Sequence, residues 1–302
     1  MPDDVNATED PELAQARYLV QQLDVTPIDV LVFGESTLTH FGPDEPDTRS
    51  VAELLIDELK PLTTYVVAGP GYGAGLQREY LRLACAMPRR PVVLLSLFVR
   101  GTYPAFYRHP QYGYRWAIER LRSTSVEAAY GVTAPRHEPS PQDYAEYEKL
   151  AYPTICGERV IDDFMDALRR RLKLGDPGFW RWLFEFHYGG SPEPEALQAY
   201  TDMGATLRRA GHPVIAYQNP INVIEAAREL GPDYPAWQAR NEQGVLDAYL
   251  EGIGDSATIL RTSSLWQPDD FIDPALEHLN AAARARLARL LADEVRGTSA
   301  RT

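Results

Sequence analysis

A serine and a histidine near opposite ends of the chain are the residues best suited to chemistry. Ser36 follows a short apolar run at residues 28–33, and His278 precedes a long helical pattern. A serine hydroxyl becomes a nucleophile when a base takes its proton, and histidine is the usual base. A carboxylate behind the imidazole holds its tautomer and stabilises its charged form. If the fold brings Ser36 and His278 together, the pair can carry out acyl transfer.

The same residues also have structural interpretations. Serine is a preferred N-cap, and Ser36 stands where the apolar run turns into the next element, so it is either a helix cap or a nucleophile. His278 is either the base or a partly buried histidine with a structural partner. The glycines within residues 69–75 either form a simple turn or offer backbone N–H groups to an oxyanion.

Short apolar runs alternate with helical patterns along the chain and predict the scaffold. Runs typical of strands cover residues 28–33, 64–68, 91–98, 213–217 and 257–260. Patterns typical of helices cover residues 11–23, 51–59, 76–87, 223–230, 234–250 and 281–295. Ser50 and Glu53 predict a capping box at the second of these helices. This order predicts an α/β fold of three layers, α/β/α, with a central parallel sheet and right-handed crossovers.

The predicted sheet would gather the candidate residues at one edge. Ser36, the glycine-rich residues 69–75 and Arg100 each follow a predicted strand. In open parallel sheets, ligands bind just beyond the carboxyl ends of the strands. His278 lies between the last predicted strand and the last predicted helix, so we expect it to reach the same edge.

The middle of the chain departs from this alternation. Helical patterns at residues 116–121, 141–151, 159–172 and 194–209 are accompanied by two segments that are rich in aromatic residues. No Gly/Ser-rich linker bounds this region. We therefore expect a single domain over residues 1–302, with a helical, aromatic-rich insertion at about 101–210 that walls or covers the site.

Composition argues against several classes of function. The net charge of −13 and the pI of about 5.0 argue against nucleic acid and anionic membranes as partners. Cys85 and Cys156 lack the spacing of a disulfide framework or a zinc site, and the histidines show no metal-ligand spacing. No apolar run reaches membrane-spanning length, and no signal-peptide pattern begins the chain, so we expect a cytoplasmic, reducing location.

The combination of motifs resembles the SGNH, or GDSL, hydrolase family. The resemblance rests on Val32-Phe-Gly-Glu-Ser36, which is similar to the family's F-G-D-S, on Gly69-Pro-Gly-Tyr-Gly73, and on Asp273 with His278-Leu-Asn280 before the closing helix. It covers about residues 28–100 and 213–295. It implies a flavodoxin-like α/β/α fold in which Ser36 is the nucleophile and His278 the base. The N–H groups of Ser36 and Gly71 would hold the oxyanion.

Two positions depart from the family pattern. Alignment with the family's third motif puts Arg100 where an asparagine usually donates to the oxyanion. Arg100 can donate in its place, bind a substrate carboxylate, or mark a chain that no longer hydrolyses. The family places an aspartate three residues before the histidine, whereas Asp273 lies further from His278. We expect Asp273 to orient His278, with Asp270 and Glu277 as the alternatives.

These residues predict a serine-dependent ester hydrolase or acyltransferase that acts on a small-molecule acyl ester. The reaction needs no cofactor and no metal. We expect Gly71, Arg100, Glu35 and Asn219 on the oxyanion and substrate side of the site, although turn chemistry also explains Asn219. The alternative is a non-catalytic binding protein on the same fold, in which Arg100 captures an anionic ligand. The sequence does not indicate an oligomeric state.

Overall fold

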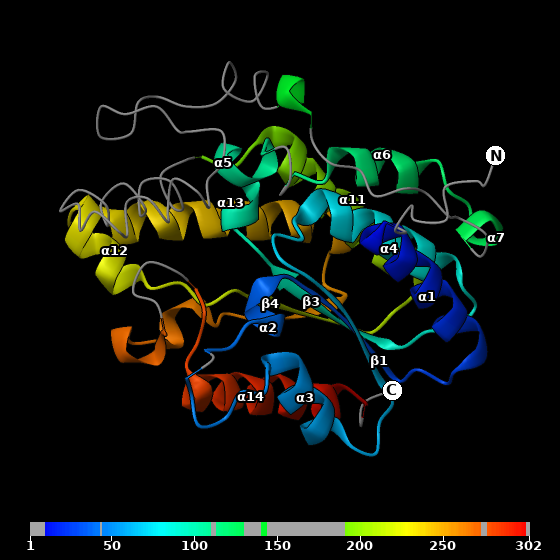
Figure 1. The fold of residues 1–302 in the computed structure, drawn as a ribbon, viewed down its shortest axis with the longest axis horizontal. Helices are drawn as coiled ribbons and strands as arrows, with labels where there is room; N and C mark the ends of the chain where they lie inside the picture. Colours follow the sequence, from blue (N-terminus) through cyan, green and yellow to red (C-terminus); the bar gives the residue numbers. More distant parts are fainter. Residues whose placement is uncertain are drawn as a thin grey trace, which may run out of the picture.

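A parallel sheet of five strands forms the centre of the part of the chain that the structure describes (Figure 1). The computed structural model describes residues 10–42, 44–109, 113–129, 140–143, 191–272 and 277–299. The strands are β1 Val30–Gly34, β2 Thr64–Ala68, β3 Val92–Leu97, β4 Val214–Gln218 and β5 Ala257–Leu260. They lie in the order β2-β1-β3-β4-β5, and each neighbouring pair is parallel.

Helices cover both faces of the sheet and form the outer layers (Figure 1). One face carries α1 Pro11–Val25, α4 Ala74–Ala86, α6 Arg115–Arg122, α7 Val126–Ala129, α11 Pro194–Ala210 and α13 Tyr234–Ile253. The other face carries α2 Ser36–Thr39, α3 Val51–Leu59 and α14 Ala281–Ser299. Connections that follow the strands contain α5 Pro104–Tyr107, α12 Val223–Leu230 and the 3-10 turns η1 Arg100–Thr102, η2 Ser263–Leu265 and η3 Pro268–Asp270. The predicted three-layer α/β/α fold is confirmed.

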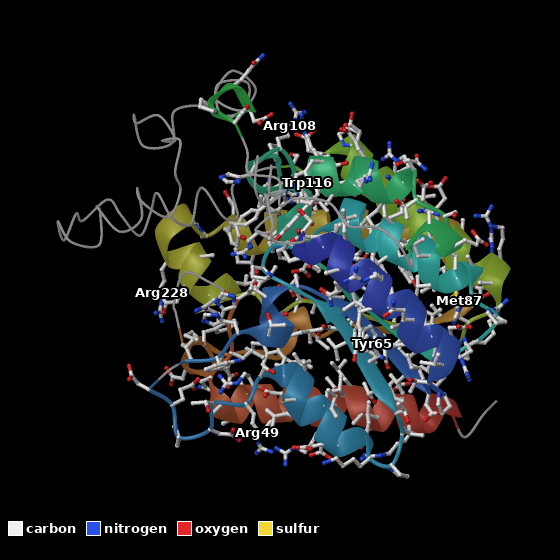
Figure 2. All side chains as sticks on the ribbon, turned by 45° about the vertical axis from the view of Figure 1, so that its right-hand side comes forward. Arg49, Tyr65, Met87, Arg108, Trp116 and Arg228 are labelled. Atoms are coloured by element: carbon white, nitrogen blue, oxygen red, sulfur yellow. The ribbon has the colours of Figure 1, made fainter. Side chains whose placement is uncertain are left out.

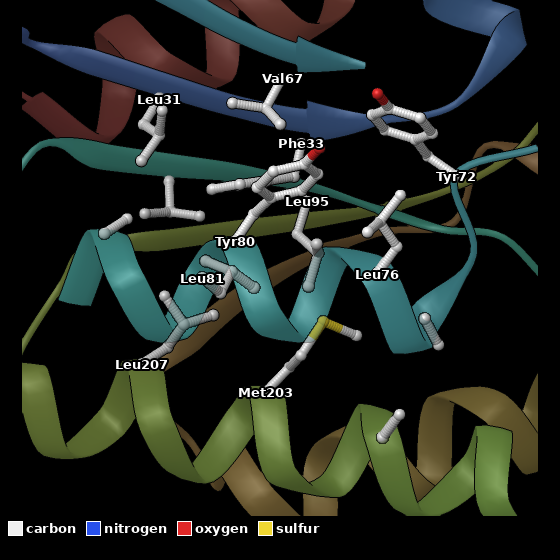
Figure 3. Close-up of a cluster of buried hydrophobic side chains, with 14 of the residues drawn as sticks. Leu31, Phe33, Val67, Tyr72, Leu76, Tyr80, Leu81, Leu95, Met203 and Leu207 are labelled. Carbon is white, nitrogen blue, oxygen red and sulfur yellow. The ribbon is translucent and has the colours of Figure 1, made fainter. Parts of the chain in front are cut away.

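The alternation of side chains along β1 explains why both faces of the sheet are covered. All residues of this strand are buried. Leu31 and Phe33 belong to a hydrophobic cluster that includes residues of α4 and α11, whereas Val30 and Val32 belong to a second cluster with residues of α3 and α14. Figure 3 shows the first cluster between the sheet and the two helices. The sheet is therefore the middle of two hydrophobic cores.

The path of the chain changes direction between β1 and β3. From β1 the chain passes to β2 on one side, and from β3 it passes to β4 on the other side. The carboxyl ends of two strands whose connections diverge are the usual ligand-binding position in such sheets. β1 leads directly to Ser36, and β3 leads to Arg100. The topology therefore puts two of the candidate residues at this position.

The predicted elements agree with the structure to within a few residues at each end. The capping box of α3 is confirmed, since Ser50 Oγ accepts a hydrogen bond from Glu53 N at 3.2 Å and Glu53 Oε2 accepts one from Ser50 N at 2.7 Å. The last helix of the predicted insertion is α11, which packs against α4 and α13 within the helical layer. The helices predicted at residues 141–151 and 159–172 lie almost entirely outside the described residues.

Charged side chains cover the outside of the described helices and loops. Arg49, before α3, and Arg228, on α12, extend from the surface (Figure 2), and their side chains are 51% and 63% exposed. Both form ion pairs at the surface, Arg49 with Asp47 and Asp57, and Arg228 with Glu225. None of the helices in the described ranges combines the length and the apolar character that a membrane span requires.

The contact between α11 and α13 is so close at Gly252 that one added methyl group should destabilise the fold strongly. A Cβ at Gly252 would lie 2.8 Å from Ala205 N and would also collide with Thr201 O, so the two helices would have to separate. We expect Gly252→Ala to lower the free energy of unfolding by about 3 kcal/mol. At Gly244, on the same helix, a Cβ meets no described atom within 4 Å. Gly244→Ala should raise the same free energy by roughly 0.5–1 kcal/mol. Urea unfolding of both variants tests the contact, and equal stabilities would contradict it.

Candidate active site

The turn from β1 into α2 places Ser36 at the carboxyl edge of the sheet. Gly34 ends β1, and a Cβ there would collide with Leu38 of α2, so glycine allows the short helix to pack directly over the strand. Glu35 is the N-cap of α2, because its Oε2 accepts a hydrogen bond from Thr37 N at 2.8 Å. Since Glu35 is the cap, the hydroxyl of Ser36 is not used for capping.

Glu35 is a buried carboxylate that joins this turn to neighbouring strands. Its Oε1 accepts hydrogen bonds from the Thr37 hydroxyl and from Asn219 Nδ2, the latter at 2.7 Å. Asn219 follows β4, is itself buried, and accepts a hydrogen bond from Ser96 of β3. Glu35 and Asn219, which we expected on the substrate side, are thus committed to a network that holds the turn of Ser36. Asn222, further along, caps α12.

Ser36 and His278 meet at the edge of the sheet. His278 Nε2 lies 3.1 Å from Ser36 Oγ, although the residues are 242 positions apart in the chain. Both side chains are only partly buried. Ser36 Oγ also lies 3.2 Å from Glu35 Oε2, so its single hydrogen has two possible acceptors. The distance between the hydroxyl and the imidazole is that of a nucleophile and its base.

The backbone around His278 is held by a short antiparallel contact. Phe271 and Leu279 form an isolated β-bridge, and Ile272 N donates to the carbonyl of His278 at 3.0 Å. Asn280 then starts α14, because its Oδ1 accepts a hydrogen bond from Ala283 N at 3.0 Å. The imidazole is therefore carried on a tethered segment between a bridge and a capped helix.

The surroundings of His278 favour the neutral imidazole. Burial lowers the pKa of His278 well below its ordinary value, and the nearby His40 and Arg100 lower it further. A neutral imidazole has a free nitrogen lone pair, which a general base requires. His278 is thus in the protonation state in which it can accept the proton of Ser36 at neutral pH.

His40 is a member of the site that sequence reasoning missed. Its ring stacks on the ring of His278, with the centroids 4.0 Å apart and the planes at 25°. The side chain of His40 is exposed, and its backbone N–H donates to the carbonyl of Ser36 at 2.7 Å. The available signal was the spacing Ser36-x-x-x-His40, which puts the two residues one helical turn apart. An isolated helical turn of this length cannot be recognised from its sequence.

Arg100 has a partner that the sequence did not indicate. Its Nη2 lies 2.5 Å from Glu277 Oε1, and both side chains are buried. The guanidinium also lies over the ring of Phe106, 4.4 Å from its centroid, and near that of Phe98. Burial raises the pKa of Glu277 to about 8, while Arg100 partly offsets this effect. The contact of Arg100 with Glu277 joins the turn after β3 to the residue directly before His278.

The candidate carboxylates behind His278 differ in position. Asp270 Oδ2 accepts hydrogen bonds from Arg286 at 2.7 Å and from Gln267 N at 2.8 Å, and Glu277 contacts Arg100. In these contacts the carboxylates of Asp270 and Glu277 bind other groups and not the imidazole of His278. Asp273, the residue that we expect to orient His278, lies outside the described residues. Its role stays a prediction.

Gly71 lies in the glycine loop beside the turn that carries Ser36. β1 and β2 pair in register up to Gly34 and Ala68, so the two segments that follow them begin side by side. Gly71 is buried and has a φ of 71°, in the left-handed region that favours glycine. A side chain at this position would strain the loop. The loop that contains Gly71 therefore starts beside the turn of Ser36, and the contact of its N–H groups with an oxyanion stays a prediction.

Arg284 links the segments that carry the two candidate catalytic residues. This side chain is fully buried in α14, and its Nη1 donates to Glu45 Oε2 at 2.6 Å. It also donates to the carbonyls of Arg49, Asp47 and Leu279. Glu45 and Asp47 belong to the loop that follows α2, whereas Leu279 follows His278. A buried guanidinium thus ties the loop after Ser36 to the segment of His278.

The described structure defines a doubly wound α/β/α domain with a serine–histidine pair at the point where the chain reverses its path through the sheet. Within the described ranges, no group of three or more His, Cys, Asp or Glu side chains is arranged to hold a metal ion. No protein-family model matches this chain, and no curated protein is similar to it in sequence. Its activity must therefore be inferred from the site.

Proposed function

We propose that this protein is a serine-dependent ester hydrolase or acyltransferase that acts on a small-molecule acyl ester through an acyl-enzyme on Ser36. The proposal is carried by the 3.1 Å distance between Ser36 Oγ and His278 Nε2. The lowered pKa of His278 supports it, because the imidazole is then neutral. The resemblance to SGNH hydrolases in the motifs around Ser36 and His278 points to the same chemistry.

In the proposed first step, Ser36 Oγ attacks the carbonyl carbon of the ester while its proton passes to His278 Nε2. The tetrahedral intermediate collapses, the alcohol leaves with the proton from His278, and the acyl group stays on Ser36. Water or another acceptor then attacks the acyl group and gives its proton to His278. That proton returns to Ser36 Oγ as the acyl product leaves. Hydrolysis and transfer differ only in the acceptor.

The oxyanion of the intermediate needs donors near Ser36. The backbone N–H of Ser36 is at the first position of α2, where N–H groups have no acceptor within the helix. We propose this N–H and that of Gly71 as the donors. Arg100 contributes a nearby positive charge while it stays in contact with Glu277. In this proposal Glu35 and Asn219 hold the turn and do not touch the substrate.

The alternative, an anion-binding protein that uses Arg100, is less well supported. Arg100 is buried, and the contact with Glu277 at 2.5 Å already occupies one side of its guanidinium. An incoming anion would compete with this carboxylate and would meet the repulsion of the nearby Glu35.

A fluorophosphonate tests the proposal directly. Attack by Ser36 would form a P–O bond and release fluoride, and the mass of the intact protein would rise by that of one phosphonyl group. We expect one adduct on the wild type and none on Ser36→Ala. Ser123→Ala, which changes an exposed serine at the end of α6, should be labelled like the wild type. A folded wild-type protein that forms no adduct would refute the proposal.

A further inference from the structure

His40 covers one face of the imidazole that the proposed mechanism uses as a base. Its ring centroid lies 4.0 Å from that of His278, and the ring planes are 25° apart. Stacked rings touch through their faces, so this contact leaves the Nε2 edge of His278 available to Ser36. His40 directly follows α2, and its N–H donates to the carbonyl of Ser36 at 2.7 Å. The stacked ring and the nucleophile therefore belong to one helical turn.

We propose that His40 is a positioning residue for the Ser36–His278 pair. Its ring holds the plane of the His278 imidazole, and its positive charge in acid moves the acidic limit of the reaction to lower pH. The inference rests on the proposed function. It adds a residue that tunes the Ser36–His278 pair, although serine–histidine chemistry does not itself require one.

The charges around His278 determine the direction of this control. Arg100 is the first residue of the turn η1 and contacts Glu277, which directly precedes His278. The carboxylate of Glu35 lies 3.2 Å from Ser36 Oγ. Burial lowers the pKa of His278, and a positive charge on the stacked His40 ring lowers it further. That charge repels a proton from the His278 ring. His278 therefore stays neutral, and able to act as a base, to a lower pH than it would alone.

Two substitutions separate the ring of His40 from its charge. His40→Phe keeps a flat ring and removes the charge, so the acidic limit of fluorophosphonate labelling should move to higher pH by about one unit, while the maximal rate stays close to that of the wild type. His40→Ala removes both, so the acidic limit should move in the same direction and the maximal rate should fall by about tenfold. Thr39→Ala alters the same helical turn and leaves both histidine rings in place, so it should leave the profile unchanged.

The titration of the His278 ring, followed by NMR, gives a readout that does not depend on activity. We expect the ring to titrate at higher pH in His40→Phe than in the wild type. If the wild-type protein forms no fluorophosphonate adduct, the proposed function fails, and this titration still decides whether His40 controls the charge of His278. An unchanged titration of His278 in His40→Phe would overturn the inference, as would a labelling profile of His40→Ala that matches the wild type.

Discussion

His278→Ala is expected to reduce the rate at which a fluorophosphonate modifies Ser36 by about 10³- to 10⁴-fold at neutral pH. The reason is the 3.1 Å contact between His278 Nε2 and Ser36 Oγ, which is lost in the variant. Without a base, the hydroxyl must attack while it still carries its proton. In the wild type, the lowered pKa of His278 keeps the base neutral, so labelling should change little with pH until well below pH 6.5. Stopped-flow or quenched labelling followed by intact mass measures both effects.

His278→Ala also leaves a space that free imidazole can enter, where it can serve as the base in place of the lost side chain. We expect added imidazole to restore part of the labelling of His278→Ala and to have no effect on Ser36→Ala. If His278→Ala keeps most of the wild-type rate, the base is the other acceptor of the Ser36 hydroxyl, Glu35 Oε2 at 3.2 Å. In that case Glu35→Gln, and not His278→Ala, would abolish labelling. The pair of variants therefore identifies the base.

Arg100→Met is expected to lower the free energy of unfolding by about 3–5 kcal/mol above about pH 8, because it removes the cation that stabilises the charged form of the buried Glu277 carboxyl. The loss should be smaller at about pH 6, because the carboxyl of Glu277 is uncharged there and a neighbouring cation stabilises it less. Urea unfolding at the two pH values measures the difference. Arg49→Met removes exposed ion pairs with Asp47 and Asp57, and we expect only a small loss of stability that is the same at both pH values.

The same pair predicts how the wild type depends on pH. The folded-state pKa of Glu277 is about 8, above its ordinary value of 4.5, so folding favours the protonated carboxyl. Its contribution to stability is complete below about pH 4.5 and is lost as the pH rises through about 8. Glu277→Gln should remove this decline. A wild type whose stability does not fall over this range more than that of Glu277→Gln would show that the carboxyl is ionised throughout.

Sequence reasoning found the scaffold because the scaffold depends on local patterns. The apolar run before Ser36 and the capping box of Ser50 and Glu53 are signals within a few residues, and the structure confirms both elements. The same approach missed His40, because α2 has only four residues and shows no periodicity. It also missed that Glu35 caps α2, since serine has the stronger N-cap preference. The final helix of the predicted insertion, α11, belongs to the helical layer, because its buried face packs on α4 and α13.

The sequence by itself determined the class of fold and singled out Ser36 and His278, which the structure brings within 3.1 Å of each other. Periodicity and residue type are local properties, and they suffice for such conclusions. Only the tertiary structure decided that His40 stacks on His278 and that Arg100 pairs with Glu277. These contacts join segments far apart in the chain, as does the contact of Ser36 and His278, which are 242 positions apart. No local pattern encodes such contacts, because they form only when the sheet and its two helical layers pack together.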